Sequence, residues 1–304
     1  MIAEFSARTF RLVSDHEVAF PGTAGFLEAI AEARKIISAI PPEFLFTFRL
    51  KVNPATMGSD PVVVIPRLLG ETEAWLGFIV HSVAYRIGQF LDDVITGIDA
   101  ARPYRSVGAA RCLLELSAFV YHHTKKLRAA VEATSQTADD FAASVKAIVE
   151  TFAAARDFVQ VTLFNWNALV RGDMDEFFTA WDKVDERVKA KRILNYIDKL
   201  PGDEKRSARF FYEMLCDYVH PNVAAHTLVV NRALPVQDGQ MRWELSREPD
   251  SSEALSVLLL AVAIPVRHSV RILLHDLGQL QQMQGYFEVW RKRCESLVQC
   301  DLKS

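Results

Sequence analysis

Cysteine is scarce in this chain, which has four among 304 residues, at positions 112, 216, 294 and 300. None of them forms a Cys-x-x-Cys pair, so no zinc-ligand spacing is present and no metal site is expected. A chain of this length buries enough apolar surface to fold without disulfide staples. The sequence therefore predicts reduced thiols, no disulfide and a cytoplasmic location.

An excess of positive charge is also missing. The chain holds 35 Lys and Arg against 38 Asp and Glu, a formal net charge of -3. Proteins that coat duplex nucleic acid neutralise phosphates with clustered Lys and Arg. The balance excludes that class and confines any nucleic-acid role to a small pocket or groove.

Long hydrophobic runs are absent as well. The longest is Ala254 to Val266, 13 residues, against the roughly 20 that span a bilayer. It predicts a buried core helix and no membrane partner.

The first ten residues lack a basic flank followed by an apolar core, so no secretory signal is expected. No Walker loop, G-x-G-x-x-G or G-x-S-x-G motif occurs, and no cofactor is expected.

What is present is a chain that is half hydrophobic and 24% charged, which is typical of a globular protein. We expect a proline-rich N-terminal segment at residues 1–66 and a helical bundle domain at 67–304. In the N-terminal segment, Phe44 to Val52 alternates as a strand does, with Phe10 to Val13 as its partner. A helix is predicted over Ala24 to Ile40, and Pro54 to Pro66 is interpreted as a linker.

The remainder is predicted to be helical, because apolar residues recur at spacings of three and four. The one exception is a hairpin around Asp238-Gly239, between Val229 to Val236 and Met241 to Leu245. Two final helices are predicted from about Ser252 to Leu302, broken or bent near Gly278 or Gly285. The other predicted helices are Glu71 to Ile98, Arg105 to Val131, Ala138 to Val170, Met174 to Trp181, Val184 to Leu200 and Asp203 to His220. The fold class is mainly α, with a small N-terminal strand element.

The end of the helix Asp203 to His220 carries the most informative polar residues. A helical wheel predicts a core-facing stripe and an opposite side with Arg209, Glu213, Cys216 and His220. A histidine at a helix end, before proline, suits an acid, a base or a ligand. The alternative is that His220 only caps the helix. The apolar stripe comprises Phe210, Phe211, Met214, Leu215, Tyr218 and Val219.

A second polar stripe runs along the helix that starts near Arg105. Arg111, Glu115, Ala118 and His122 share one side at spacings of three and four. Either this stripe faces water, with Arg111 and Glu115 as a surface ion pair, or it faces a cleft where His220 meets them. A basic cluster in the C-terminal helical region has two interpretations. It is either a phosphate or RNA contact or the exposed side of an ordinary helix. It comprises Arg267, His268, Arg271 and His275.

Three blocks carry a family resemblance: Arg111 to Glu115, Ile193 to Leu200 and Tyr212 to Asn222. They resemble uncharacterised bacterial helical proteins with a Val-His-Pro-Asn or Val-His-Pro-Ser signature, which are similar to the HEPN-like (higher eukaryote and prokaryote nucleotide-binding) superfamily. The resemblance implies a helical bundle, usually dimeric, whose active members cleave RNA without a metal through paired arginine and histidine. Here Arg209 lies eleven positions before His220, farther than in that pattern, so Arg111 is the candidate to complete the pair. Arg11 and His16 fit the spacing but are interpreted as chance.

Three functions are therefore carried forward. The first is a binding or sensing module in a bacterial stress or defence system. It would form a homodimer through the helices at 105–131 and 203–220, and its RNA or nucleotide ligand would lie near Glu115, Tyr212, Cys216 and Asn222. The second is a metal-independent ribonuclease, in which Arg111 holds phosphate and His220 acts as general acid or base. The third is a protein-interaction scaffold, in which the same polar residues are structural.

Overall fold

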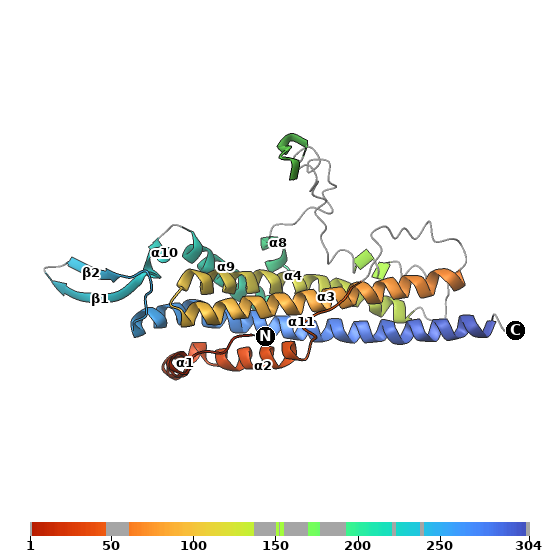
Figure 1. Ribbon diagram of the computed structural model, residues 1–304, viewed down its shortest axis with the longest axis horizontal. Coiled ribbons are helices and arrows are strands. Elements are labelled where there is room, and N and C mark those ends of the chain that lie inside the picture. Colours follow the sequence, from red (N-terminus) through yellow and green to blue (C-terminus); the bar gives the residue numbers. More distant parts are fainter. Residues whose placement is uncertain are drawn as a thin grey trace. The chain divides into compact units, whose positions relative to one another are not determined.

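The computed structural model describes residues 2–46, 61–136, 150–151, 153–154, 170–176, 193–220, 223–237 and 240–301. These residues are mainly helical, so the predicted fold class is confirmed (Figure 1). The chain divides into two compact units. Three long helices contribute to both: α3 (Pro61–Asp99), α4 (Pro103–Gln136) and α11 (Ser252–Asp301). Unit 1 comprises Met1–Leu45, Val80–His122 and Tyr196–Leu280, and unit 2 comprises Phe46–Ile79, His123–Asn195 and Gln281–Ser304. The expected domain boundary at residue 66 stays a prediction.

Unit 1 begins with two helices, α1 (Ala7–Ala19) and α2 (Phe26–Ser38), joined through the short helix η1 (Pro21–Thr23). The strand predicted at Phe10 to Val13 is wrong, because these residues lie inside α1. Thr9, Val13 and His16 are its buried residues, and their spacing of four and three is a helical period. α2 lies within the helix predicted at Ala24 to Ile40. The other predicted strand, Phe44 to Val52, lies outside the described residues from 47 on, and Phe44 to Phe46 form no regular element.

Carboxylates of α3 hold the first residues of the chain. The Asp92 carboxylate accepts from the backbone N–H of Ala3 at 2.9 Å, and the Asp99 carboxylate accepts from both the N–H and the hydroxyl of Ser6. Asp93 instead binds the guanidinium of Arg105 at 2.6 Å. The adjacent aspartates therefore serve two separate structural contacts.

α3 (Pro61–Asp99) and α4 (Pro103–Gln136) are consecutive long helices. The linker predicted at Pro54 to Pro66 is wrong for residues 61–66, which form the first turns of α3. A tight turn joins the two helices, with Ala101 at a φ of 51°. Gly97 lies where the turn brings the helices closest, and its carbonyl accepts from the Arg102 N–H at 2.7 Å.

Three helices precede the hairpin: α8 (Leu194–Ile197), α9 (Gly202–Val219) and α10 (Val223–Thr227). α9 begins after Pro201 with two acidic residues in its first turn, which favour a helix N-terminus. It ends at His220, whose backbone is extended (φ -86°, ψ 153°) as a residue before proline requires. The predicted helices Ala138 to Val170, Met174 to Trp181 and Val184 to Leu200 lie largely outside the described residues.

The predicted hairpin is present as β1 (Val230–Gln237) and β2 (Gln240–Leu245), an antiparallel pair. In unit 1 the two strands form a separate ribbon beyond α10 and the start of α11 (Figure 1). The pairing shifts after Val230 and again after Leu234.

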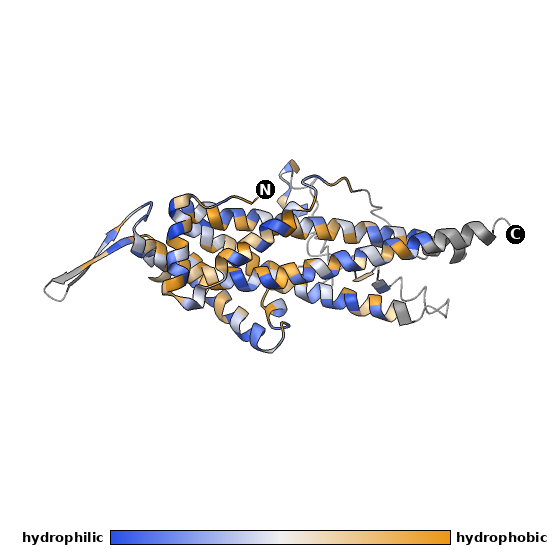
Figure 2. Cartoon of the chain, turned by 90° about the horizontal axis from the view of Figure 1, so that it is seen from below, coloured by the Kyte–Doolittle hydropathy of each residue, from blue (hydrophilic) through white to orange (hydrophobic). Residues whose placement is uncertain are grey.

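A single helix, α11 (Ser252–Asp301), closes the described part of the chain. The two predicted helices are one, so a break near Gly278 or Gly285 is wrong. Buried residues continue past both glycines: Leu277, Leu280, Met283 and Phe287. That burial outweighs the roughly 1 kcal/mol that each helical glycine costs relative to alanine. Among the described helices, α11 alone is long and apolar enough to cross a membrane, but 67% of its most apolar window is buried, as in a core helix. Apolar residues recur along the long helices (Figure 2).

Unit 2 has its own small aromatic and ionic contacts. The ring of Phe46 lies 4.9 Å from Phe78 and 5.9 Å from Trp75. The guanidinium of Arg291 binds the carboxylate of Glu73 at 2.6 Å across elements 218 residues apart. No residue of the predicted site lies in this unit.

Candidate functional site

Four of the six predicted site residues lie where α4 faces α9, in unit 1: Arg111, Glu115, Tyr212 and Cys216. Arg111 and Glu115 are one helical turn apart on α4, and the guanidinium Nε donates to the Glu115 carboxylate at 2.9 Å. Both side chains are half-buried, with 28% and 31% of their surfaces exposed. The charge of Arg111 is thus neutralised by a neighbour on its own helix.

Tyr212 of α9 covers the Arg111 guanidinium. Arg111 Nη2 donates to the Tyr212 hydroxyl at 3.3 Å, and the guanidinium carbon lies 5.3 Å from the centre of the tyrosine ring. The second distance is in the range of a cation–π contact. Cys216 lies on the same side of α9, one turn further along. We name the group Arg111, Glu115, Tyr212 and Cys216 the Arg111 clasp.

Burial at this contact opposes ionisation of two groups, the Tyr212 hydroxyl and the neighbouring Cys112 thiol. Burial raises the pKa of the Tyr212 hydroxyl, and the attraction of Arg111 lowers it only in part. Burial, together with the negative charge of Glu115, also raises the pKa of the neighbouring Cys112 thiol. For Arg111, burial is outweighed by Cys216, Glu115 and Tyr212, and the guanidinium pKa is raised. The Glu115 carboxylate, which accepts from Arg111 Nε, is the ionic partner of the guanidinium in this contact.

The rest of the predicted α4 stripe is covered by another tyrosine. The ring of Tyr196, in α8, lies 5.5 Å from His122 and 5.4 Å from Phe119. Ala118 is fully buried. The stripe is therefore only partly exposed, because α8 and α9 pack along it. Sequence reasoning missed Tyr196, although it lies in one of the three blocks that carry the resemblance.

The helical wheel predicted for α9 is partly wrong. Phe210 is 62% exposed rather than buried, while Cys216 is half-buried against α4. Leu215 is fully buried, as predicted, and the other four residues of the predicted stripe are half-buried. The wheel is rotated because Ala208, Leu215 and Tyr212 form the side that meets the bundle.

His220 is exposed at the end of α9, and its backbone N–H donates to the Cys216 carbonyl at 2.9 Å. Within the described residues its side chain forms no hydrogen bond or ion pair with Arg111. Tyr212, which Arg111 contacts, precedes His220 by eight residues, or about 12 Å along a helix. Asn222, the remaining predicted ligand residue, lies outside the described part of the chain.

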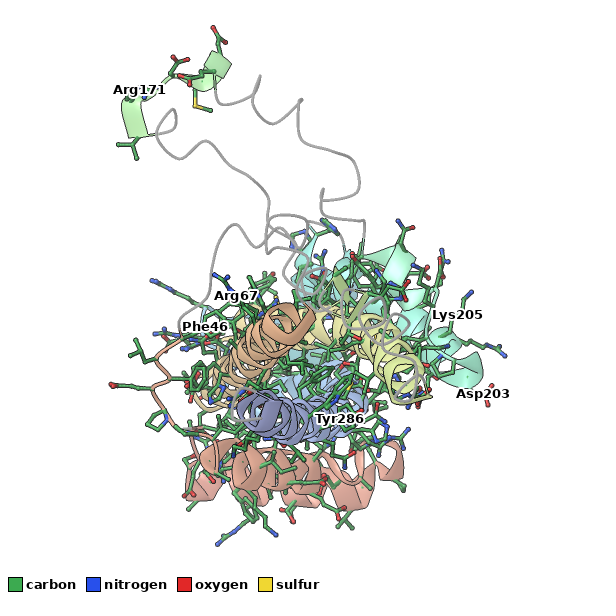
Figure 3. All side chains as sticks on the ribbon, turned by 90° about the vertical axis from the view of Figure 1, so that its right-hand side faces the viewer. Phe46, Arg67, Arg171, Asp203, Lys205 and Tyr286 are labelled. Atoms are coloured by element: carbon green, nitrogen blue, oxygen red, sulfur yellow. The ribbon has the colours of Figure 1, made fainter. Side chains whose placement is uncertain are left out.

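The outer side of α9 is a charged surface of mixed sign. Arg209 pairs with Asp198 at 3.3 Å and with Glu213 at 3.1 Å, and Lys205 lies 3.8 Å from Asp198. Figure 3 shows Lys205 and Asp203 on the outside of the helix. An open depression of about 370 Å³ follows this side, lined by Gly202, Lys205, Arg206, Arg209, Phe210 and Glu213.

The predicted basic cluster on α11 is divided among several contacts. Arg267 donates to the backbone carbonyl of Ala24, and Arg271 lies 3.6 Å from Glu204. His268 is packed near the ring of Phe211, and burial lowers its pKa. His275 bonds Gln279, its neighbour one turn along. These contacts favour the structural interpretation over a phosphate site.

Arg11 and His16, the pair whose spacing was interpreted as chance, do not form a site either. His16 is buried in α1, and its Nδ1 lies 3.3 Å from the hydroxyl of Thr23. Arg11 is exposed. Among the described residues no group of three or more His, Cys, Asp or Glu side chains is placed to hold a metal ion.

The clasp is expected to couple Arg111 and Tyr212 energetically. In a double-mutant cycle, Arg111→Met and Tyr212→Leu should each lower the free energy of unfolding by about 1 kcal/mol, with a coupling of about 0.5 kcal/mol or more. The measurement is urea unfolding. Arg128→Met is the control, because Arg128 forms an exposed pair with Glu132 at the same spacing on the same helix. Its loss should be a few tenths of a kcal/mol. Additive effects at Arg111 and Tyr212 would contradict the clasp.

In comparisons with known proteins, the chain matches no family model, no curated protein and no solved structure.

Proposed function

We propose that the protein is a non-enzymatic helical scaffold whose role is to associate with other protein chains. The observation that carries the proposal is the Arg111 clasp. The side chains with the strongest sequence case for ligand chemistry are satisfied by one another, at the line where α9 packs on α4. A phosphate at Arg111 would have to compete with Glu115 and displace the Tyr212 ring.

The ribonuclease alternative requires Arg111 and His220 to act on one phosphodiester. A catalytic pair must lie within hydrogen-bond reach of the same substrate group. Arg111 contacts α9 two turns before its end, and His220 is exposed beyond that end. This separation favours the helix-capping interpretation of His220 within one chain.

Exposed apolar side chains support an assembly role. Val223 of α10 is 74% exposed and Leu245 of β2 is 64% exposed, in addition to Phe210 of α9. All three belong to unit 1. Large apolar side chains in water are a common mark of protein interaction sites when they gather on one part of a molecule. The mixed charges on α9, by contrast, give a polyanion such as RNA no uniform positive surface.

RNA cleavage and ligand binding assays test the proposal against its two rivals. The purified chain is incubated with short RNAs, and its melting temperature is measured with nucleotides and the same RNAs. We expect no cleavage and no shift, and His220→Ala should leave the melting temperature unchanged. His226→Ala is the matched control for His220→Ala, because His226 is also exposed at the end of a helix.

Two outcomes would overturn the scaffold proposal. Cleavage that His220→Ala abolishes without a change in melting temperature would establish the ribonuclease. A shift with nucleotide or RNA that Arg111→Met abolishes would establish the binding or sensing module. The role in bacterial stress or defence and the HEPN-like relationship stay predictions under either result.

A further inference from the structure

The outer edge of β2 is the least protected strand edge in the described part of the chain. The hairpin is a two-stranded sheet, so each strand pairs on one side only. Isolated hairpins are marginal in water, and proteins usually blunt free edges with proline, lysine or a bulge. β1 contains Pro235, which has no N–H to offer, and a pairing shift after Leu234. β2 contains neither proline nor lysine.

The backbone groups of β2 that point outward can be identified. The Ser246 N–H donates to the Val229 carbonyl at 2.9 Å, so Ser246 faces β1. Because successive residues of a strand direct their N–H and C=O groups to opposite edges, Glu244 and Arg242 also face β1. The N–H and C=O groups of Met241, Trp243 and Leu245 therefore point to the outer edge, where another strand can pair.

The side chains of β2 are self-complementary about Trp243. Arg242 and Glu244 flank it, and all three are exposed. If a second β2 pairs antiparallel about a two-fold axis at Trp243, each Arg242 lies opposite a Glu244 of the other strand. The outward groups of Trp243 then form a hydrogen-bonded pair. Arg242 and Glu244 fall in the closer, non-hydrogen-bonded positions, where opposite charges stabilise most.

The neighbouring registers are unfavourable. The same outward groups also permit pairing shifted so that Arg242 lies opposite Arg242 or Glu244 opposite Glu244. Each of these places like charges directly across the strands, which is destabilising. Only the register centred on Trp243 matches both the hydrogen-bonding direction and the charges.

We propose that two copies of the chain join through β2, antiparallel and in register at Trp243, to form a four-stranded sheet. The two Trp243 side chains, each 47% exposed in the single chain, become cross-strand neighbours in it. The Glu244 carboxylate accepts from the Asn231 amide at 2.9 Å, and Glu244 lies across from Arg232 in its own hairpin. In the proposed sheet it also lies across from Arg242 of the second copy. The inference rests on the proposed scaffold function and names its partner.

Charge reversal tests the register directly. Arg242→Glu and Glu244→Arg each turn both Arg–Glu pairs of the dimer into like-charge pairs. Sedimentation equilibrium over a range of concentrations should show dimers for the wild type and an association weaker by about 10- to 100-fold for each variant. Mixing the two variants in equal amounts should restore dimers, because each chain then meets its complement. Arg11→Glu is the matched control, since Arg11 is exposed on α1, away from the hairpin.

Each result is decisive. A wild type that stays monomeric at all concentrations overturns the inference, and so does a dimer that the single variants leave intact. Circular dichroism must show equal helix content in all chains. If both variants are folded and monomeric but their mixture does not associate, the register at Trp243 is wrong. RNA cleavage would overturn the scaffold function without affecting the sedimentation result, so the two proposals fail separately.

Discussion

Replacing Gly97 by alanine is expected to destabilise the protein by about 2–4 kcal/mol. A Cβ at this position would lie 2.3 Å from the hydroxyl oxygen of Ser106 and 2.9 Å from the Ser106 backbone nitrogen. Ser106 is fully buried, and its hydroxyl donates to the carbonyl of Val94. The side chain has no space to move into, so α3 and α4 must separate at their turn.

Gly108→Ala supplies the control for this prediction. Gly108 is a helical glycine of α4 with nothing within 4 Å of an added Cβ. The substitution should stabilise the chain by about 0.5–1 kcal/mol, because alanine loses less backbone entropy in a helix. Urea unfolding measures both variants. Combining Gly97→Ala with Ser106→Ala should recover part of the loss, since the closest contact disappears. If Gly97→Ala unfolds within about 0.5 kcal/mol of the wild type, the helices do not approach as described.

Truncating Phe26 to alanine is expected to cost about 3–5 kcal/mol. The Phe26 side chain is fully buried, and the Phe5 ring lies 6.4 Å from it. Its N–H starts α2 by donating to the Glu17 carboxylate at 2.7 Å. One residue thus fixes both the beginning of α2 and its packing, and the alanine variant leaves a cavity at this point.

Phe10→Ala is the matched control, because Phe10 lies on α1 with 53% of its surface exposed. We expect a change of less than about 0.5 kcal/mol. Both variants are compared by thermal and urea unfolding, which should agree in rank. Equal losses at Phe10 and Phe26 would mean that α2 is not anchored through the buried ring.

Local patterns in the sequence were sufficient for several elements. α2, α4, α9 and the hairpin lie close to their predicted ranges, because each carries its own period and its own proline or glycine boundary. The local patterns gave wrong predictions where the same few residues fit two kinds of secondary structure. Phe10 to Val13 has the alternation of a strand, yet the longer spacing of Thr9, Val13 and His16 is helical. Gly278 and Gly285 are helix breakers in isolation, yet the buried stripe of α11 continues past them.

The candidate site shows the same division. Sequence spacing placed Arg111 beside Glu115, and the two form an ion pair one turn apart. The contact between Arg111 and Tyr212 joins residues 101 positions apart, and no local period encodes it. The rotation of α9, which exposes Phe210 and turns Cys216 toward α4, likewise depends on the partner helix.

Composition and local periodicity are enough to show that this chain is mainly helical, that a hairpin interrupts the helices between Val230 and Leu245, and that positive charge is not in excess. These properties follow from composition and from periods of two and three to four residues, which act over a few turns. Only the packing of distant segments places Tyr212 and Tyr196 against the polar stripe of α4. That outcome depends on which side of α8 and α9 meets it, and a packing choice between distant segments is set by the burial of both surfaces together.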